Sequence, residues 1–200
     1  MKVIVIGATG TIGNEVAKAF TAKKHQVLGA SRKGEIKVDI EDSASIEKLF
    51  ATHKDVDAVV SCAGDGAFKA LTELTDADFE LCLRSKLMGQ VNLARIAAKH
   101  IKDKGSVTLT TGVLAIHPMP GSAAISLVNA GLEGFIRAAG LEAPRGIRFN
   151  AVSPPWIKET MVKFGMDPTP GLSSADCARA YVAAIEGSHQ GKVIDAANVG

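Results

Sequence analysis

The chain has 200 residues, of which 46% are hydrophobic and 22% are charged, and its formal net charge is +2. This length and balance predict one globular domain spanning residues 1–200, and the weak, scattered positive charge argues against a nucleic-acid or membrane partner. Three cysteines without metal-ligand spacing, and no apolar run approaching about 18 residues, predict a cytoplasmic protein with no metal site.

Short β-branched runs alternate with helical patterns along the whole chain. Strands are predicted at 2–6, 26–30, 36–38, 58–61, 106–110, 148–152 and 192–194. Helices are predicted between them, at 12–23, 43–52, 76–101, 122–143 and 174–187. Because such alternation builds right-handed βαβ crossovers, it predicts a doubly wound parallel sheet, the Rossmann fold, with about seven strands and helices on both faces. The Pro- and Gly-rich segment 163–173 is predicted to be a mobile loop over a site.

The first strand runs directly into a glycine turn that opens the first predicted helix. The turn and the start of the helix comprise Gly7, Thr9, Gly10, Thr11, Ile12 and Gly13. Glycine is needed where the chain turns tightly, where its backbone approaches a pyrophosphate, and where the helix packs closely on the sheet. A diphosphate placed here would meet the free N–H groups of the helix. The turn therefore predicts a dinucleotide site, and the alternative is an ordinary strand-to-helix connection.

The residues after the second strand indicate which dinucleotide would bind. Ser31, Arg32 and Lys33 stand there, with no acidic residue among them. An acidic side chain at this point would bind the ribose hydroxyls of NAD, whereas a cation and a hydroxyl suit the 2′-phosphate of NADP. The sequence therefore predicts NADP in preference to NAD. The alternative interpretation is a solvated basic turn.

Five motifs in chain order resemble those of the short-chain dehydrogenase/reductase family, and the likeness covers nearly the whole chain. They are the glycine turn and the segments 38–40, 61–64, 132–135 and 144–154. The last is the most specific, because it is similar to the family's pattern P-x-G-I-R-x-N-x-V-x-P. The glycine spacing, G-x-x-G-x-x-G, resembles that of extended and atypical members. The resemblance implies a nicotinamide coenzyme and oxidoreductase chemistry.

The resemblance also implies which residues border the coenzyme. In chain order these are Asp39 and Ile40 at the adenine, Ala63 and Gly64 at the adenosine ribose, and Pro154, Trp156 and Ile157 at the nicotinamide. Glu159 stands where the family has a threonine that contacts the pyrophosphate, and Thr160 follows one residue late. Because a carboxylate beside phosphates repels them, we expect Glu159 to disturb the nicotinamide pose.

The catalytic tetrad of the family is missing at the corresponding positions. Matching the flanking motifs places Lys86 where the family has asparagine, Gly112 for serine, Ile125 for tyrosine and Asn129 for lysine. Isoleucine cannot replace a tyrosine, whose pKa of about 10 becomes useful near neutrality only beside a lysine cation. The only tyrosine, Tyr181, falls in the last predicted helix, away from the expected site.

Lys86 is the leading candidate for a replacement proton donor, because a desolvated lysine has a lowered pKa and can donate to a carbonyl oxygen. The alternative is a lysine that fills the space left by the tetrad. Ser122, Ser126 and Asn129 share one helical stripe, which would hydrogen-bond a substrate or pack against another subunit. Thr111, at the end of the fifth strand, is a candidate replacement for the lost serine hydroxyl.

Functions of different classes remain open at this point. One is an NADP-dependent oxidoreductase that acts on a small carbonyl or alcohol with a non-standard proton donor. Another is a non-catalytic NADP-binding sensor or scaffold, which accounts directly for the missing tetrad. The intact glycine turn argues against a purely structural domain. By analogy with the family, we expect a homodimer or homotetramer formed through the long helices 76–101 and 122–143.

Overall fold

Seven parallel strands form one sheet in the computed structural model, which describes residues 1–199. The strands are β1 (Lys2–Ile6), β2 (Gln26–Ser31), β3 (Ile36–Lys37), β4 (Ala58–Ser61), β5 (Ser106–Thr110), β6 (Arg148–Ser153) and β7 (Val193–Asp195). Their order across the sheet is β3-β2-β1-β4-β5-β6-β7. The predicted doubly wound parallel sheet is confirmed, and every predicted strand boundary lies within one residue of the observed one.

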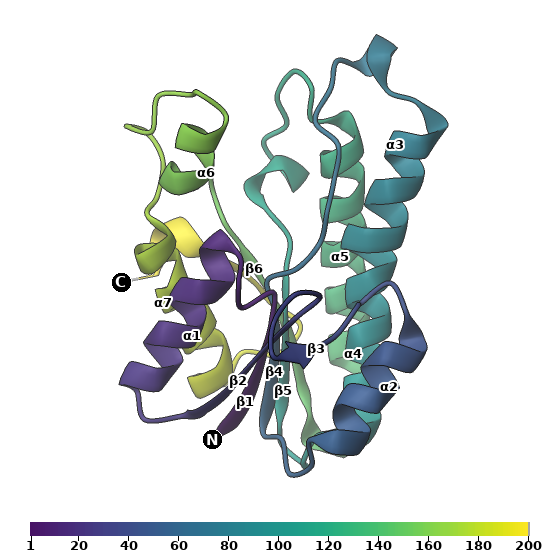
Figure 1. Ribbon diagram of the computed structural model, residues 1–200, viewed down its shortest axis with the longest axis vertical. Coiled ribbons are helices and arrows are strands. Elements are labelled where there is room, and N and C mark those ends of the chain that lie inside the picture. The colour runs from purple at the N-terminus through teal and green to yellow at the C-terminus, as the bar shows by residue number, and fades with distance from the viewer. Residues whose placement is uncertain (200) are drawn as a thin grey trace.

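Helices cover both faces of the sheet (Figure 1). On one face α1 (Thr11–Ala22) packs against α7 (Ser174–Glu186), and on the other lie α2 (Ser43–Thr52), α4 (Gln90–His100) and α5 (Ala123–Glu142). A further helix, α6 (Lys158–Lys163), precedes most of the segment predicted as a loop. The sequence analysis missed α6, because its six residues are too few to show a helical period.

The long predicted helix 76–101 has three parts. It starts as α3 (Asp76–Leu81), continues as a π-helical segment (Cys82–Gly89), and ends as α4. Thr75 and Asp78 form a capping box that fixes the start, since each side chain accepts a hydrogen bond from the other's backbone N–H. Wide π turns inside α-helices are rare and occur frequently at functional sites. The π-helical segment contains Lys86, the candidate proton donor.

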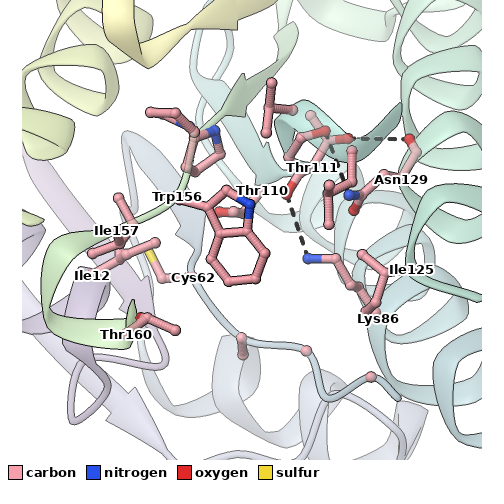
Figure 2. A pocket seen from close by; sticks show the side chains of 18 residues that line it. Ile12, Cys62, Lys86, Thr110, Thr111, Ile125, Asn129, Trp156, Ile157 and Thr160 are labelled. Carbon is pink, nitrogen blue, oxygen red and sulfur yellow. Dashed lines mark hydrogen bonds between the residues drawn. The ribbon is translucent and has the colours of Figure 1, made fainter. Parts of the chain in front are cut away.

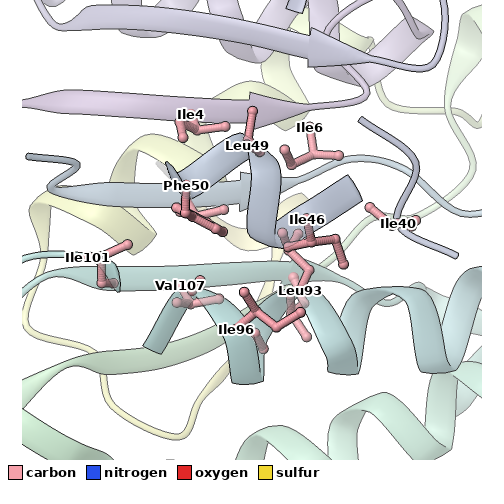
Figure 3. Close-up of a cluster of buried hydrophobic side chains, with 14 of the residues drawn as sticks. Ile4, Ile6, Ile40, Ile46, Leu49, Phe50, Leu93, Ile96, Ile101 and Val107 are labelled. Carbon is pink, nitrogen blue, oxygen red and sulfur yellow. The ribbon is translucent and has the colours of Figure 1, made fainter. Parts of the chain in front are cut away.

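Alternate side chains of β1 build the two halves of the core. Ile4 and Ile6 are buried against Phe50 of α2 and Leu93 of α4 (Figure 3). The intervening valines of β1 face the opposite layer, formed by α1 and α7. Because successive strand residues point to opposite faces, a wholly apolar strand must be covered on both sides. Burial of each such side chain contributes about 1.5–3 kcal/mol, which holds the strand ends in a fixed arrangement.

The strand order places a crevice at the carboxyl end of β1. The chain builds outward from β1 through β2 to β3, and then crosses to β4 on the other side of β1. Loops leaving β1 and β4 therefore diverge, and this is where doubly wound sheets bind ligands. Among residues 1–199, every helix is either too short or too polar to traverse a lipid bilayer.

Candidate active site

The glycine turn between β1 and α1 leaves no room for side chains. Gly7 has φ +80°, a left-handed conformation that favours glycine. A Cβ added to Gly13 would lie 2.1 Å from the carbonyl oxygen of Gly7, so a side chain there would push α1 off the strand. Gly10 is the N-cap of α1, and within residues 1–199 no side chain caps this helix. The first N–H groups of α1 are thus free for an anionic ligand.

Two adjoining cavities lie beyond the strand ends and share Cys62, Ala63 and Gly64. The first, here the glycine-turn cavity, has a volume of about 330 Å³. Its lining includes the predicted coenzyme residues Gly7, Thr9, Gly10, Ser31, Arg32, Asp39 and Ile40. The second, here the Lys86 cavity, has a volume of about 280 Å³, and its lining includes Ile12, Lys86, Thr111, Ile125, Asn129, Pro154, Trp156 and Ile157. Residues predicted from separate motifs therefore meet in one continuous crevice.

Lys86 forms part of one wall of its cavity. Figure 2 shows Lys86 and Ile125 on one side and Ile12 and Ile157 on the other, with the indole of Trp156 between them. The Nζ atom of Lys86 donates a hydrogen bond of 3.4 Å to the carbonyl oxygen of Thr111. Burial lowers the pKa of Lys86 from 10.5 to about 8.

Two neighbours fix the backbone of Lys86. A Cβ on Gly64 would lie 3.0 Å from the Cα of Lys86, so the bare glycine lets the loop after β4 lie directly against the π-helical segment. Gln90, which is fully buried, donates from Nε2 to the carbonyl oxygens of Lys86 and Thr110 at 3.0 and 2.9 Å. Its Oε1 accepts from the Thr110 N–H at 2.9 Å. The sequence analysis missed Gln90, whose only signal is an amide among the apolar positions of α4.

Thr111 and Asn129 hold the far wall of the Lys86 cavity. The hydroxyl of Thr111 donates to the backbone carbonyl of Asn129 at 3.1 Å, and Nδ2 of Asn129 is 3.4 Å from the carbonyl of Gly112. Oδ1 of Asn129 is buried and has no hydrogen-bond partner among residues 1–199. That atom is an available acceptor for a bound ligand, because buried acceptors are rarely left unpaired.

Ser126, also a candidate, does not line the Lys86 cavity. Its hydroxyl lies 3.1 Å from that of Ser122, which donates to the carbonyl of Met119 at 2.7 Å. The Ser122 hydroxyl also accepts from the Met119 N–H at 3.0 Å, which fixes the turn before α5, and neither serine lines the crevice. Only Asn129 of the three reaches it.

Tyr181 lines neither cavity, but it lies directly behind the wall of the Lys86 cavity. It is fully buried in the layer formed by α1 and α7, and its hydroxyl is 2.7 Å from Oγ1 of Thr110. Burial raises the pKa of Tyr181 well above its usual value. Thr110 lines the Lys86 cavity, so its hydroxyl lies between the phenol of Tyr181 and that cavity.

The side chain of Glu159 is turned toward the start of α7. Its carboxylate accepts hydrogen bonds from the backbone N–H of Ser174, the nearer at 3.0 Å, and so faces the start of α7. Thr160, one residue later, lines the Lys86 cavity. Nearby, Nζ of Lys163 donates to the hydroxyl of Thr11 at 2.8 Å, which puts a cation at the first residue of α1. Repulsion of a diphosphate by Glu159 stays a prediction, although its carboxylate lines neither cavity.

Comparison with known proteins agrees with the motifs. The sequence profile of a family described as enoyl-(acyl carrier protein) reductase matches residues 8–184. Hydroxynaphthalene reductase arp2 of Aspergillus fumigatus is 30% identical over 160 residues, which cover 78% of this chain and 56% of that protein. The 3-oxoacyl-(acyl-carrier-protein) reductase FabG of Rickettsia typhi is 27% identical over 176 residues, 79% of this chain and 73% of that one. The chain spans about half the length of the first curated relatives it matches.

Solved structures of similar length share the whole fold. The protein lin1944 from Listeria innocua is 36% identical with a TM-score of 0.90, and the match covers 98% of each chain. A small-chain dehydrogenase in complex with NADPH is 26% identical with a TM-score of 0.86, over 98% of this chain and 95% of that one. The family profile, the parallel sheet and the motif order agree, and the chain belongs to the short-chain dehydrogenase/reductase family.

Proposed function

We propose that this protein is an NADPH-dependent oxidoreductase that reduces a small carbonyl compound, or oxidises the matching alcohol, with Lys86 as the proton donor. The observation that carries the proposal is the position of the Lys86 amine, in the wall of a cavity continuous with the glycine-turn cavity. The NADPH complex of a small-chain dehydrogenase with the same fold supports this choice of coenzyme.

The residues present fit a phosphorylated dinucleotide. The start of α1 fits a diphosphate, because Gly10 leads into the helix without a side-chain cap and leaves the first backbone N–H groups free for an anion. Oγ of Ser31 is buried and lacks a hydrogen-bond partner within residues 1–199, and it lines the same cavity as Arg32. A 2′-phosphate would give the hydroxyl an acceptor and the guanidinium an anion.

When bound, the nicotinamide supplies the hydride, and the chain supplies orientation and a proton. A pKa of about 8 leaves Lys86 mostly protonated at neutral pH, yet close enough to neutrality for efficient transfer to a carbonyl oxygen. The Thr111 carbonyl holds the ammonium in place before transfer. After transfer the neutral amine suits its buried surroundings, which disfavour charge.

The walls of the Lys86 cavity favour a small, largely apolar substrate. Ile125, Val113 and Trp156 present apolar surface, and the volume of about 280 Å³ restricts the size of the compound. Trp156 is itself braced by Phe68, whose ring meets it edge-on with centroids 5.9 Å apart. Apolar walls exclude water from the reacting atoms and strengthen the hydrogen bond from Lys86.

A panel of small aldehydes, ketones and alcohols tests the proposal, with coenzyme absorbance as the readout and calorimetry of NADPH binding on the same samples. We expect micromolar binding of NADPH and turnover of at least one compound. NADPH binding with no turnover across the panel would contradict the reductase.

NADPH binding without turnover would favour a non-catalytic NADP-binding sensor or scaffold. The observation behind this alternative is the wall of the Lys86 cavity, where Gly112, Ile125 and Asn129, the residues matched to tetrad positions by the family resemblance, offer no acidic or basic side chain. Binding of the coenzyme would then stabilise the crevice without chemistry. Absence of binding to either NADP or NAD at millimolar concentration would contradict both functions.

We also propose a homodimer or homotetramer built through α3, α4 and α5. Large apolar side chains are exposed on the segment from α3 to α4 and on α5; they are Leu83, Met88, Leu127 and Leu141. Association through these helices would bury them. Light scattering is expected to report a dimer or larger, and a monomer at working concentration would contradict this assembly. Three free cysteines fit the reducing cytoplasm that we propose as the setting.

A further inference from the structure

An ion pair crosses the glycine-turn cavity, and the sequence analysis did not predict it. Nη2 of Arg32, just after β2, donates to Oδ2 of Asp65 at 2.7 Å. Asp65 follows β4, and β2 and β4 lie on opposite sides of β1. The pair therefore bridges the two loops that flank the end of β1, and both of its residues line the cavity.

Asp65 is held in this position by its backbone. Its N–H donates to Oγ of Ser85 at 3.0 Å, and Ser85 is only 2% exposed. The preceding residue, Gly64, lies against the backbone of Lys86. The carboxylate of Asp65 is thus presented to Arg32 from an anchored loop.

Other acidic groups at the cavity are placed differently. The carboxylate of Glu41 accepts a hydrogen bond from Nε of Arg84 at 2.6 Å, and Oδ1 of Asp39 accepts one from the Glu41 N–H at 3.0 Å. The hydrogen bond with Asp65, followed by its charge, raises the pKa of Arg32, while Asp39 and Glu41 add smaller effects. Of these acidic residues, Asp65 is therefore the one that forms the ion pair with the Arg32 guanidinium.

The pair is exposed enough to be exchanged. The side chains of Arg32 and Asp65 are 57% and 51% exposed, and such pairs are worth about 0–1 kcal/mol. An arginine binds a phosphate bidentately and more strongly than it binds a single carboxylate oxygen in water. A 2′-phosphate arriving at Arg32 would displace Asp65, but the displaced carboxylate would remain close to a like charge.

We propose that Asp65 is a specificity-determining residue of the coenzyme site, because its carboxylate competes with the 2′-phosphate for Arg32. The inference rests on the proposed function, in which Arg32 binds that phosphate. NADP must break the pair in order to bind, whereas NAD, which lacks the 2′-phosphate, leaves it intact. Asp65 thereby reduces the ratio of NADP affinity to NAD affinity that Ser31 and Arg32 would otherwise give.

Calorimetry with NADP⁺ and NAD⁺ tests this inference on the wild type, Asp65→Asn, Arg32→Gln and the double variant. We expect Asp65→Asn to bind NADP⁺ about fivefold more tightly and NAD⁺ within about twofold of the wild type. In the Arg32→Gln background, Asp65→Asn should increase the affinity for NADP⁺ by less, because the guanidinium for which the carboxylate and the phosphate compete is gone. Circular dichroism checks that each variant is folded.

Glu73→Gln is the matched control, since it removes the same charge from an exposed residue outside the cavity. It should leave both affinities unchanged, which separates local competition from a change in net charge. Weaker NADP⁺ binding by Asp65→Asn, or equal shifts for both coenzymes, would overturn the role of Asp65 while the proposed function stood. A wild type that binds neither coenzyme would overturn both.

Discussion

The two cavities of the crevice are built by different means. Backbone sterics shape the glycine-turn cavity. Gly7 has a positive φ, and a Cβ on Gly13 would clash with the Gly7 carbonyl, so both positions require glycine. Side chains shape the Lys86 cavity, whose walls include Lys86, Ile125 and Asn129. The contrast teaches that the two cavities can be altered separately: backbone conformation limits substitution in the first, whereas side-chain exchange alters the second.

The largest expected effect on the glycine-turn cavity comes from a substitution at Gly13. Gly13→Ala puts a Cβ 2.1 Å from the Gly7 carbonyl oxygen. Relief of that clash must move α1, so we expect loss of measurable NADPH binding and a decrease of about 1–3 kcal/mol in the free energy of unfolding. Calorimetry and chemical denaturation measure the two effects.

Gly134→Ala is the control for that substitution. A Cβ at Gly134, within α5, meets nothing within 4 Å in the described chain. It should therefore bind NADPH normally and gain about 0.5–1 kcal/mol from the better helix propensity of alanine. Normal NADPH binding by Gly13→Ala as well would contradict the steric account of the turn.

Arg32→Gln sharpens the comparison inside the glycine-turn cavity. Loss of a charge-assisted contact with the 2′-phosphate should weaken NADPH binding about 10- to 100-fold. NADH binding should change little, because NADH has no group at that position. If both reduced coenzymes weaken equally in a direct titration, Arg32 does not read the phosphate.

The pH dependence of carbonyl reduction tests the role of the Lys86 cavity in the wild-type protein, without a substitution. Lys86 has its proton below a pKa of about 8 and loses it above, so the rate should be constant near neutrality and fall as the pH rises past 8. Oxidation of the alcohol should show the opposite trend, since it needs the neutral amine. A pH-independent reduction rate, measured at saturating NADPH, is inconsistent with Lys86 as the donor.

The smallest expected effect is on stability. Burial lowers the folded-state pKa of Lys86 from 10.5 to about 8, so below pH 8 the folded protein holds this proton less favourably than the unfolded chain. Lys86→Met removes that penalty and should raise the Tm by about 2–4 °C near neutrality. The gain should fade between pH 8 and 10.5, where the folded wild type has already lost the proton. A lower Tm for Lys86→Met at pH 7 would show that the charge is well solvated.

The parts of the structure that depend on local pattern were predictable. The alternation of apolar runs and helical periods located the strands, and the steric demands of Gly7, Gly10 and Gly13 located the cradle. Lys86 and Asn129 were found because they sit between recognisable family motifs.

The other features of the structure could not be predicted. They depend on contacts between segments far apart in the sequence, or on helical geometry that no sequence pattern indicates. The Arg32–Asp65 pair joins loops on either side of β1, and nothing in either loop alone specifies it. The π-helical segment, the short α6 and the buried amide of Gln90 have no periodic signal. Ser126 was predicted for the site because it shares a helical stripe with Asn129, and spacing along a helix does not say which members of a stripe line a cavity.

The most direct test of the central claim compares wild type, Lys86→Met and the control Lys48→Met, which alters an exposed lysine of α2 outside both cavities. NADPH affinity and the rate of carbonyl reduction are measured on the same samples. The account predicts that Lys86→Met binds NADPH within about twofold of the wild type but reduces about 10²- to 10⁴-fold more slowly, while Lys48→Met matches the wild type in both. A wild-type reduction rate in Lys86→Met would contradict it.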